Sequence, residues 1–171
     1  MRILDMAGAS QQTIAYITGL GHQLYSDDLI VTLDRIFGTE DPYANQAARS
    51  LAEQFLASSV DFPPEHFDGV LLWDTLQFLE PALLEAMIAR LYAIVRPGSI
   101  LFALFHEEKA TVVPCCSYRI ADRRTIVMQP RGQRRPAQYF NNRGLERLFE
   151  RFESVKFFLT RDALREVLVR R

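Results

Sequence analysis

The segment that most constrains the fold is 67–105, where two apolar runs of strand length flank one segment of helix length. Phe67–Trp73 is apolar along almost its whole length, which is typical of a strand buried on both faces of a sheet. The helix that follows runs from Glu80 to about Val95, with a proline in its first turn and an Arg-Pro-Gly sequence after its end. Ser99–Phe105 is the second strand. The segment therefore predicts a parallel strand–helix–strand crossover in the middle of a sheet.

Two shorter strands are predicted before this segment. They are Arg2–Met6, which is largely apolar, and His22–Ser26, which follows the helix-ending Gly19 and Gly21. A helix over Gln11–Thr18 lies between them, and Ser10 is placed to cap it. The next predicted elements are a short helical turn and loop over Leu29–Pro42, a helix over Asn45–Ala57 and a weak strand over Ser59–Phe62.

The last third of the chain predicts a helix and a closing strand pair. A helix begins at Asn142, after a polar section rich in arginine. Two apolar runs follow, Val155–Leu159 and Leu164–Val169, and the four residues between them are too few for a crossover, so these two strands are expected to be antiparallel. The alternation of strands and helices along the chain predicts an α/β fold with a mostly parallel sheet covered on both faces.

Composition limits the organisation and the partners of the chain. With 171 residues, 49% of them hydrophobic, we expect a single domain spanning 1–171. The net charge of -1 gives no field that would favour nucleic acid, and no apolar run approaches the roughly 20 residues that span a membrane. The only cysteines, Cys115 and Cys116, are adjacent and lack the spacing of a zinc site, so we expect no metal. We expect a cytoplasmic location, because the first residues lack the order of a signal peptide and two neighbouring thiols fit a reducing compartment.

Together these elements resemble the class I S-adenosylmethionine-dependent methyltransferases over nearly the whole chain, most specifically in 67–105. The resemblance implies a Rossmann-like three-layer sandwich. Its mostly parallel seven-stranded sheet would have the order 3-2-1-4-5-7-6, with the last strand antiparallel. It also implies S-adenosyl-L-methionine as cofactor and methyl transfer to a small-molecule or protein acceptor as activity.

The resemblance places the cofactor at the carboxyl ends of the first and fourth strands, where open α/β sheets bind ligands. Small side chains after the first strand let the backbone approach the methionine part of the cofactor. The predicted cofactor-binding residues are Asp5, Ala7, Gly8, Ala9, Ser10, Asp28, Phe62, Trp73 and Asp74.

Several of these residues have a structural alternative. Asp28 would accept hydrogen bonds from the ribose hydroxyls, or it caps the helix that follows. Phe62 would pack against adenine, or it belongs to the core. Asp74 would contact the amino group of the cofactor or the acceptor, or it caps a helix. His106, at the end of the fifth strand, is the candidate general base if the acceptor must lose a proton, and its alternative is a structural histidine.

The arginine-rich section is the other local signal. Six arginines fall within seventeen residues of a β-hairpin-like insert, so recognition of a phosphate or carboxylate is one interpretation and a solvated loop is the other. They are Arg119, Arg123, Arg124, Arg131, Arg134 and Arg135.

Two hypotheses from different classes follow. The family's glycine pattern would put glycines where this chain has Ala7, Ala9 and Gln11, so a catalytically inactive methyltransferase-like binding or scaffolding module is the alternative to an enzyme. A nicotinamide enzyme is disfavoured because the G-x-G-x-x-G spacing is absent. Since the first strand begins at Arg2, the resemblance also predicts a crevice open on one side. Either a second copy of the chain covers it in a homodimer, or the domain binds its cofactor weakly.

Overall fold

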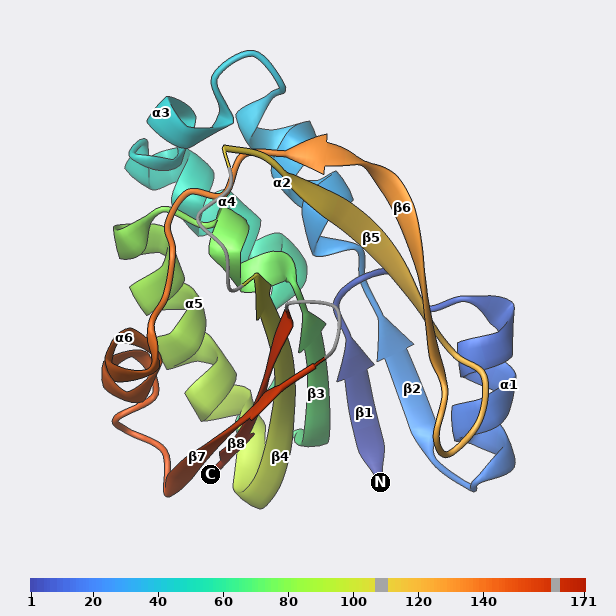
Figure 1. Ribbon diagram of the computed structural model, residues 1–171. Helices are drawn as coiled ribbons and strands as arrows, with labels where there is room; N and C mark the ends of the chain where they lie inside the picture. Colours follow the sequence, from blue (N-terminus) through green and yellow to red (C-terminus); the bar gives the residue numbers. More distant parts are fainter. Residues whose placement is uncertain (107–110, 161–163) are drawn as a thin grey trace.

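The computed structural model describes residues 1–106, 111–160 and 164–171. Its centre is a six-stranded sheet in the order β2-β1-β3-β4-β8-β7 (Figure 1). The first four strands of that order are parallel, and β8 is antiparallel to both of its neighbours. The strands of this sheet are β1 (Arg2–Asp5), β2 (Gln23–Ser26), β3 (Phe67–Trp73), β4 (Val95–His106), β7 (Ser154–Leu159) and β8 (Leu164–Arg170).

Helices connect these strands much as the sequence pattern predicts. The long crossover helix over Pro81–Ile94 joins the two central strands and buries six side chains. The helices are α1 (Gln11–Gly19), α2 (Leu29–Phe37), α3 (Pro42–Gln46), α4 (Arg49–Ser59), η1 (Thr75–Phe78), α5 (Pro81–Ile94) and α6 (Asn142–Leu148). The predicted turn over Leu29–Pro42 is thus more regular than expected, because α2 spans nine residues and turns four apolar positions toward the core.

The prediction of a strand over Ser59–Phe62 is wrong. Helix α4 continues through Ser59, and the segment after it, which ends in Pro63-Pro64, forms no strand. A strand this short cannot continue into two prolines, since proline has no N–H to donate to a neighbouring strand. The observed order therefore matches the expected order without its third strand, and β2 is an edge of the sheet.

The two faces of the sheet are covered differently. On one face, helices α2, α4, α5 and α6 pack against strand residues such as Val70 and Leu72 in one large core cluster. The alternate residues of the same strand, Leu71 and Trp73, point to the other face, where they belong to a smaller cluster. This alternation is the period of two that β-strands impose.

Most of the arginine-rich section forms a two-stranded antiparallel hairpin, β5 (Val113–Ile120) and β6 (Ile126–Arg134). The loop interpretation holds for Arg123 and Arg124, which lie in the exposed connection between the two strands. The hairpin forms its own sheet and lies over the second face of the central sheet, beside α1 (Figure 1). Cys116 and Tyr118 of β5 pack there against Trp73 and Leu104. The backbone N–H of Ile120 donates to Thr13 Oγ1 of α1 at 3.0 Å, which ties the hairpin to that helix.

Candidate functional site

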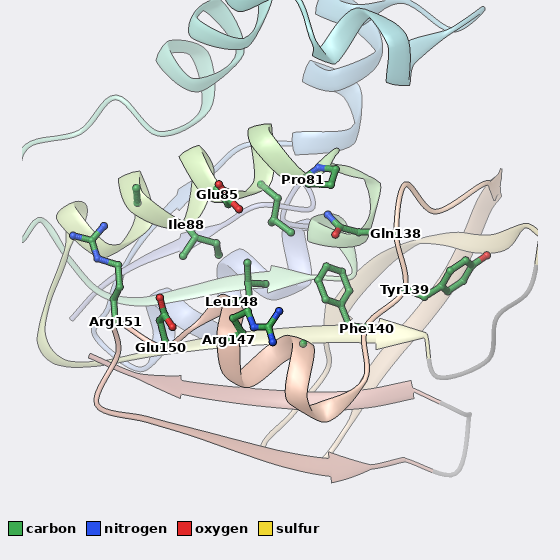
Figure 2. A pocket seen from close by; sticks show the side chains of 13 residues that line it. Pro81, Glu85, Ile88, Gln138, Tyr139, Phe140, Arg147, Leu148, Glu150 and Arg151 are labelled. Atoms are coloured by element: carbon green, nitrogen blue, oxygen red, sulfur yellow. The ribbon is translucent and has the colours of Figure 1, made fainter.

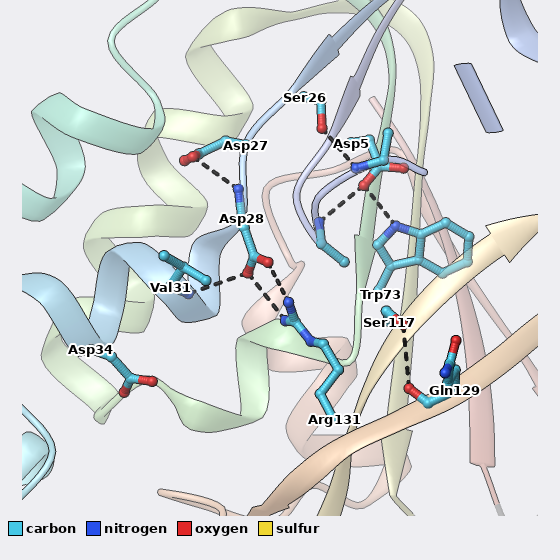
Figure 3. A network of polar contacts seen from close by, with 12 residues as sticks. Asp5, Ser26, Asp27, Asp28, Val31, Asp34, Trp73, Ser117, Gln129 and Arg131 are labelled. Atoms are coloured by element: carbon cyan, nitrogen blue, oxygen red, sulfur yellow. Dashed lines mark hydrogen bonds and ion pairs between the residues drawn. The ribbon is translucent and has the colours of Figure 1, made fainter. Parts of the chain in front are cut away.

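Asp5 organises the turn after β1. The Ala7 backbone N–H donates to Asp5 Oδ1 at 3.0 Å, and the Trp73 indole Nε1–H donates to the same oxygen at 3.1 Å (Figure 3). Asp5 is only 1% exposed, and its burial raises the pKa of the carboxyl above its usual value. The carboxylate therefore joins the end of β1 to the end of β3, as their adjacent places in the sheet allow.

Asp28 lies against the same turn. The Gly8 N–H donates to the Asp27 carbonyl at 2.9 Å, and Ala7 forms an isolated β-bridge with Asp28. Asp28 Oδ1 accepts the Val31 N–H at 3.2 Å, so Asp28 caps α2, which confirms the capping interpretation. The same carboxylate lies against the turn, because a Cβ placed on Gly8 would lie 3.0 Å from Asp28 Oδ2.

This close approach gives a prediction for Gly8. Its φ of +75° and its contact with Asp28 both oppose a side chain, whereas Gly21 has φ +80° and no atom within 4 Å of the point that a Cβ would occupy. We expect Gly8→Ala to lower the free energy of unfolding by about 2 kcal/mol and Gly21→Ala by about 1 kcal/mol. Urea unfolding of the two variants measures the difference. Equal losses would show that Gly8 is needed for its backbone angle alone.

Trp73 ends the buried strand β3, and Asp74 follows it. Trp73 has φ +54°, an unusual backbone conformation for a residue with a large side chain. Its buried indole stacks on the Tyr118 ring of β5, with the ring centroids 4.5 Å apart and the planes 6° from parallel. Asp74 is 1% exposed, and its burial raises the pKa of the carboxyl to about 7. Its side chain makes no capping hydrogen bond, so the capping interpretation is wrong for Asp74.

The region between the sheet and the hairpin holds several buried polar atoms without a hydrogen-bond partner in the described part of the chain. They include Asp5 Oδ2 and Gln77 Nε2. Such atoms are rare in folded proteins because each loses its hydration without compensation. Asp5 Oδ2 is a carboxylate oxygen at the end of β1, and the buried Asp74 carboxylate, which interacts with the Tyr118 hydroxyl, follows the neighbouring strand β3. The arrangement is therefore suited to a ligand that carries positive charge and hydrogen-bond donors.

Ala9, Ser10 and His106, which are also predicted site residues, each take part in a hydrogen bond of their own. The Ala9 N–H donates to Ser26 Oγ at 2.7 Å, and Ser10 caps α1 by accepting the Thr13 N–H. The His106 N–H donates to Gln77 Oε1 at 3.3 Å, and partial burial of the imidazole lowers its pKa. Its catalytic role stays a prediction.

Phe62 is not brought together with the other candidates. Its ring packs edge-to-face on Tyr25 and Phe67, with centroid distances of 6.0 and 4.8 Å, and lies nearly parallel to the His66 ring. Phe67 begins β3, whereas the crevice lies at the carboxyl end of that strand. Phe62 also contacts the helix-covered core cluster, as the core interpretation expects.

Sequence reasoning expected a hairpin-like insert and named Arg131 in it, but it did not predict which residues of the hairpin complete the site. Both guanidinium Nη groups of Arg131 donate to the Asp28 carboxylate, Nη2 to Oδ1 at 3.2 Å (Figure 3). Tyr118 and Arg131 sit on a segment whose apolar and β-branched residues could have indicated strands. The pairing of Arg131 with Asp28 spans 103 positions, and nothing local in the sequence indicates it.

An open pocket of about 550 Å³ lies elsewhere, between α5, α6 and the segment 138–140 (Figure 2). Leu84, Ile88 and Leu148 form part of its apolar wall. None of its described lining residues belongs to the turn at Gly8 or to the end of β3, so this pocket is separate from the candidate site.

No protein-family model matches the chain, and a search of curated protein sequences found no match. Similar solved structures exist, however. A protein from Pyrococcus horikoshii has a TM-score of 0.58 at 16% identity, with 99% of this chain and 81% of that chain covered. A methyltransferase described as S-adenosylmethionine-dependent, from Archaeoglobus fulgidus, has a TM-score of 0.59 at 12% identity, covering 99% and 86%. The chain has a class I methyltransferase-like fold.

A third similar structure contains ligands. It is the 1,6-didemethyltoxoflavin-N1-methyltransferase of Burkholderia thailandensis, bound to 1,6-didemethyltoxoflavin and S-adenosylhomocysteine. Its TM-score is 0.54 at 18% identity, with 99% of this chain and 70% of that chain covered. These comparisons confirm the predicted methyltransferase-like α/β fold. In the described residues, no helix has the length and apolar character needed to cross a membrane.

Proposed function

We propose that the chain binds S-adenosylmethionine between the carboxyl ends of β1 and β3 and transfers its methyl group to a small-molecule or protein acceptor. The observation that carries this proposal is the convergence of Asp5 and Asp28 on the turn at Gly8, with Asp74 after the neighbouring strand end of β3. Strand ends beside the point where the strand order reverses are the usual ligand site of an open α/β sheet. The methyltransferase-like fold supports the choice of cofactor.

The residues present fit such a cofactor. Asp5 has a buried carboxylate oxygen without a partner in the described residues, and the carboxylate of Asp74 is buried beside Tyr118. Positive charge on the ligand would compensate the burial of both acids. Asp28 has acceptor oxygens for ribose hydroxyls. Gly8 has no side chain, so none lies between the backbone of the turn and Asp28. The cofactor, when bound, supplies an electrophilic methyl group.

The chain's own contribution to transfer is positioning and the exclusion of water. Trp73 and Tyr118 form a stacked wall over the strand ends, and holding two reactants in line can supply most of the rate enhancement. If the acceptor must lose a proton, His106 is placed at the same edge of the sheet, as the last residue of β4. Its lowered pKa keeps the imidazole neutral near pH 7, so a ring nitrogen is able to accept that proton.

The test is calorimetric titration with S-adenosylhomocysteine. Asp28→Asn keeps the cap of α2, because asparagine caps helices as well as aspartate does, but removes the charge that strengthens hydrogen bonds to hydroxyls. We expect this variant to weaken binding about tenfold to a hundredfold. Asp41→Asn is the matched control, because Asp41 caps α3 in the same way. It should bind as the wild-type protein does.

Two results would contradict the proposal. One is the absence of heat and of a thermal shift at millimolar S-adenosylmethionine and S-adenosylhomocysteine. The other is equal weakening by Asp28→Asn and Asp41→Asn, which would place the ligand elsewhere.

A catalytically inactive binding or scaffolding module is the second candidate. It is favoured by the hairpin itself, since Arg131 already pairs with Asp28 and Tyr118 already stacks on Trp73. The two functions differ in one measurement. An enzyme releases S-adenosylhomocysteine when incubated with S-adenosylmethionine and its acceptor, whereas an inactive module binds the ligand, or a partner, without turnover.

A further inference from the structure

We infer that Arg131 competes with the ribose hydroxyls of the cofactor for Asp28, and so determines how tightly the site binds S-adenosyl ligands. This inference rests on the proposed function. It assigns a role to Arg131, a residue of the β5–β6 hairpin that lies far from Asp28 in the sequence. The fold alone does not require an arginine at this position.

The hydrogen-bonding capacity of Asp28 carries the argument. A carboxylate has about four lone-pair positions. On Oδ1, one is used by the Val31 N–H and one by Arg131 Nη2, and on Oδ2 one is used by Arg131 Nη1. The fourth lies on the oxygen that closely approaches Gly8. Two ribose hydroxyls therefore cannot both bind while the Arg131–Asp28 ion pair is intact.

The ion pair is also placed so that a ligand can displace it. Its side chains remain 31% and 20% exposed, and water-exposed ion pairs contribute little free energy. A hollow of about 250 Å³, lined in part by Ile30, Val31 and Arg131, adjoins the pair and leaves room for the guanidinium to move. Because the hairpin forms its own sheet, such a movement breaks no hydrogen bond of the central sheet.

A neighbouring ion pair shows that Arg131 is not needed to attach the hairpin to α2. Arg134, three residues further along β6, donates to both oxygens of Asp34 at 2.5 and 2.6 Å. Asp34 lies on the same helix that Asp28 caps. Removal of either arginine therefore removes one ion pair between β6 and α2. Only removal of Arg131 leaves Asp28 free to accept hydrogen bonds from the ribose hydroxyls.

The experiment compares these two arginines by calorimetric titration of the full chain with S-adenosylhomocysteine. We expect Arg131→Ala to bind about fivefold to tenfold more tightly than the wild-type protein, and Arg134→Ala to bind as the wild type does. Arg131→Lys keeps the charge but loses the paired geometry, so it should fall between them. It also serves as the test if Arg131→Ala does not fold. Salt provides a second measurement: between about 50 and 500 mM NaCl, wild-type affinity should rise while that of Arg131→Ala stays constant, because salt screens the competing pair.

The outcomes separate this inference from the proposed function. Unchanged or weaker binding by Arg131→Ala, with a wild-type protein that does bind, overturns the competition and leaves the proposed function standing. Equal tightening by Arg131→Ala and Arg134→Ala also overturns it, since loosening of the hairpin would then be the cause. If no variant binds the ligand at millimolar concentration, the proposed function is wrong and the inference is wrong with it.

Discussion

Asp74→Asn is expected to gain stability over the wild-type protein as the pH rises, by about 2 to 3 kcal/mol between pH 5 and pH 8. Burial raises the pKa of Asp74 in the folded protein to about 7, above the usual 3.8 of an aspartate. Between these two values the unfolded chain has lost the proton while the folded chain keeps it. The contribution of Asp74 to wild-type stability is therefore complete at low pH. It decreases as the pH rises toward 7 and changes no further above that pH.

The variant isolates this effect because asparagine has the same shape and no charge. Other buried groups also change the stability with pH: Asp5 and Asp27 have raised pKa values and act in the same direction, whereas the lowered pKa of His106 opposes them. These contributions are common to both proteins and cancel in the difference. Urea unfolding at pH 5, 6, 7 and 8 gives that difference directly. A difference that does not change with pH would show that Asp74 ionises normally in the folded protein.

The raised pKa of Asp74 also affects the binding of a ligand. At neutral pH Asp74 is only partly ionised, and a cationic ligand beside it would favour the charged form. Binding of an S-adenosyl ligand in the proposed site is thus expected to release a proton. The pH dependence of unfolding and the release of a proton on binding are therefore two independent measurements of the ionisation of Asp74.

How far the sequence predicts this molecule depends on whether the signal is local. The crossover over 67–105 could be predicted because a strand buried on both faces is apolar throughout, and the flanking helix has clear start and stop residues. The weak strand over Ser59–Phe62 could not be judged from apolar character alone. Its apolar residues, including Phe62, pack into the core from a non-strand segment.

The candidate site also has residues that local sequence signals predict and residues that they do not. Asp5, Asp28 and Asp74 each follow or end a predicted strand, and the topology of the sheet brings those ends together. Their proximity could therefore be predicted before any side chain was placed. Arg131 and Tyr118 reach the site only through the position of the hairpin over the sheet, which depends on tertiary packing. An arginine-rich sequence gives no indication of which arginine pairs with which acid.

Trp73→Ala is expected to lower the free energy of unfolding by about 3 to 5 kcal/mol. The indole is buried, stacks on Tyr118, lies edge-to-face on Phe102 at 5.6 Å and donates to Asp5. Trp73→Phe retains a ring for stacking and loses the donor, so about 1 to 2 kcal/mol is expected for it. Trp73 is the only tryptophan of the chain, so unfolding must be followed by circular dichroism rather than by its fluorescence. Equal losses for the two variants would mean that stacking on Tyr118 contributes little.

Trp73→Gly then separates the backbone from the side chain. In a strand of ordinary geometry glycine is less stable than alanine, by about 0.5 to 1 kcal/mol. At φ +54° the order should be reversed, because alanine bears the steric cost of the left-handed region and glycine does not. We expect Trp73→Gly to be about 1 kcal/mol more stable than Trp73→Ala. The usual order would show that the backbone relaxes once the indole is removed. The reversed order would show that the turn after β3 keeps its geometry without the side chain, and so holds Asp74 in place at the end of the strand.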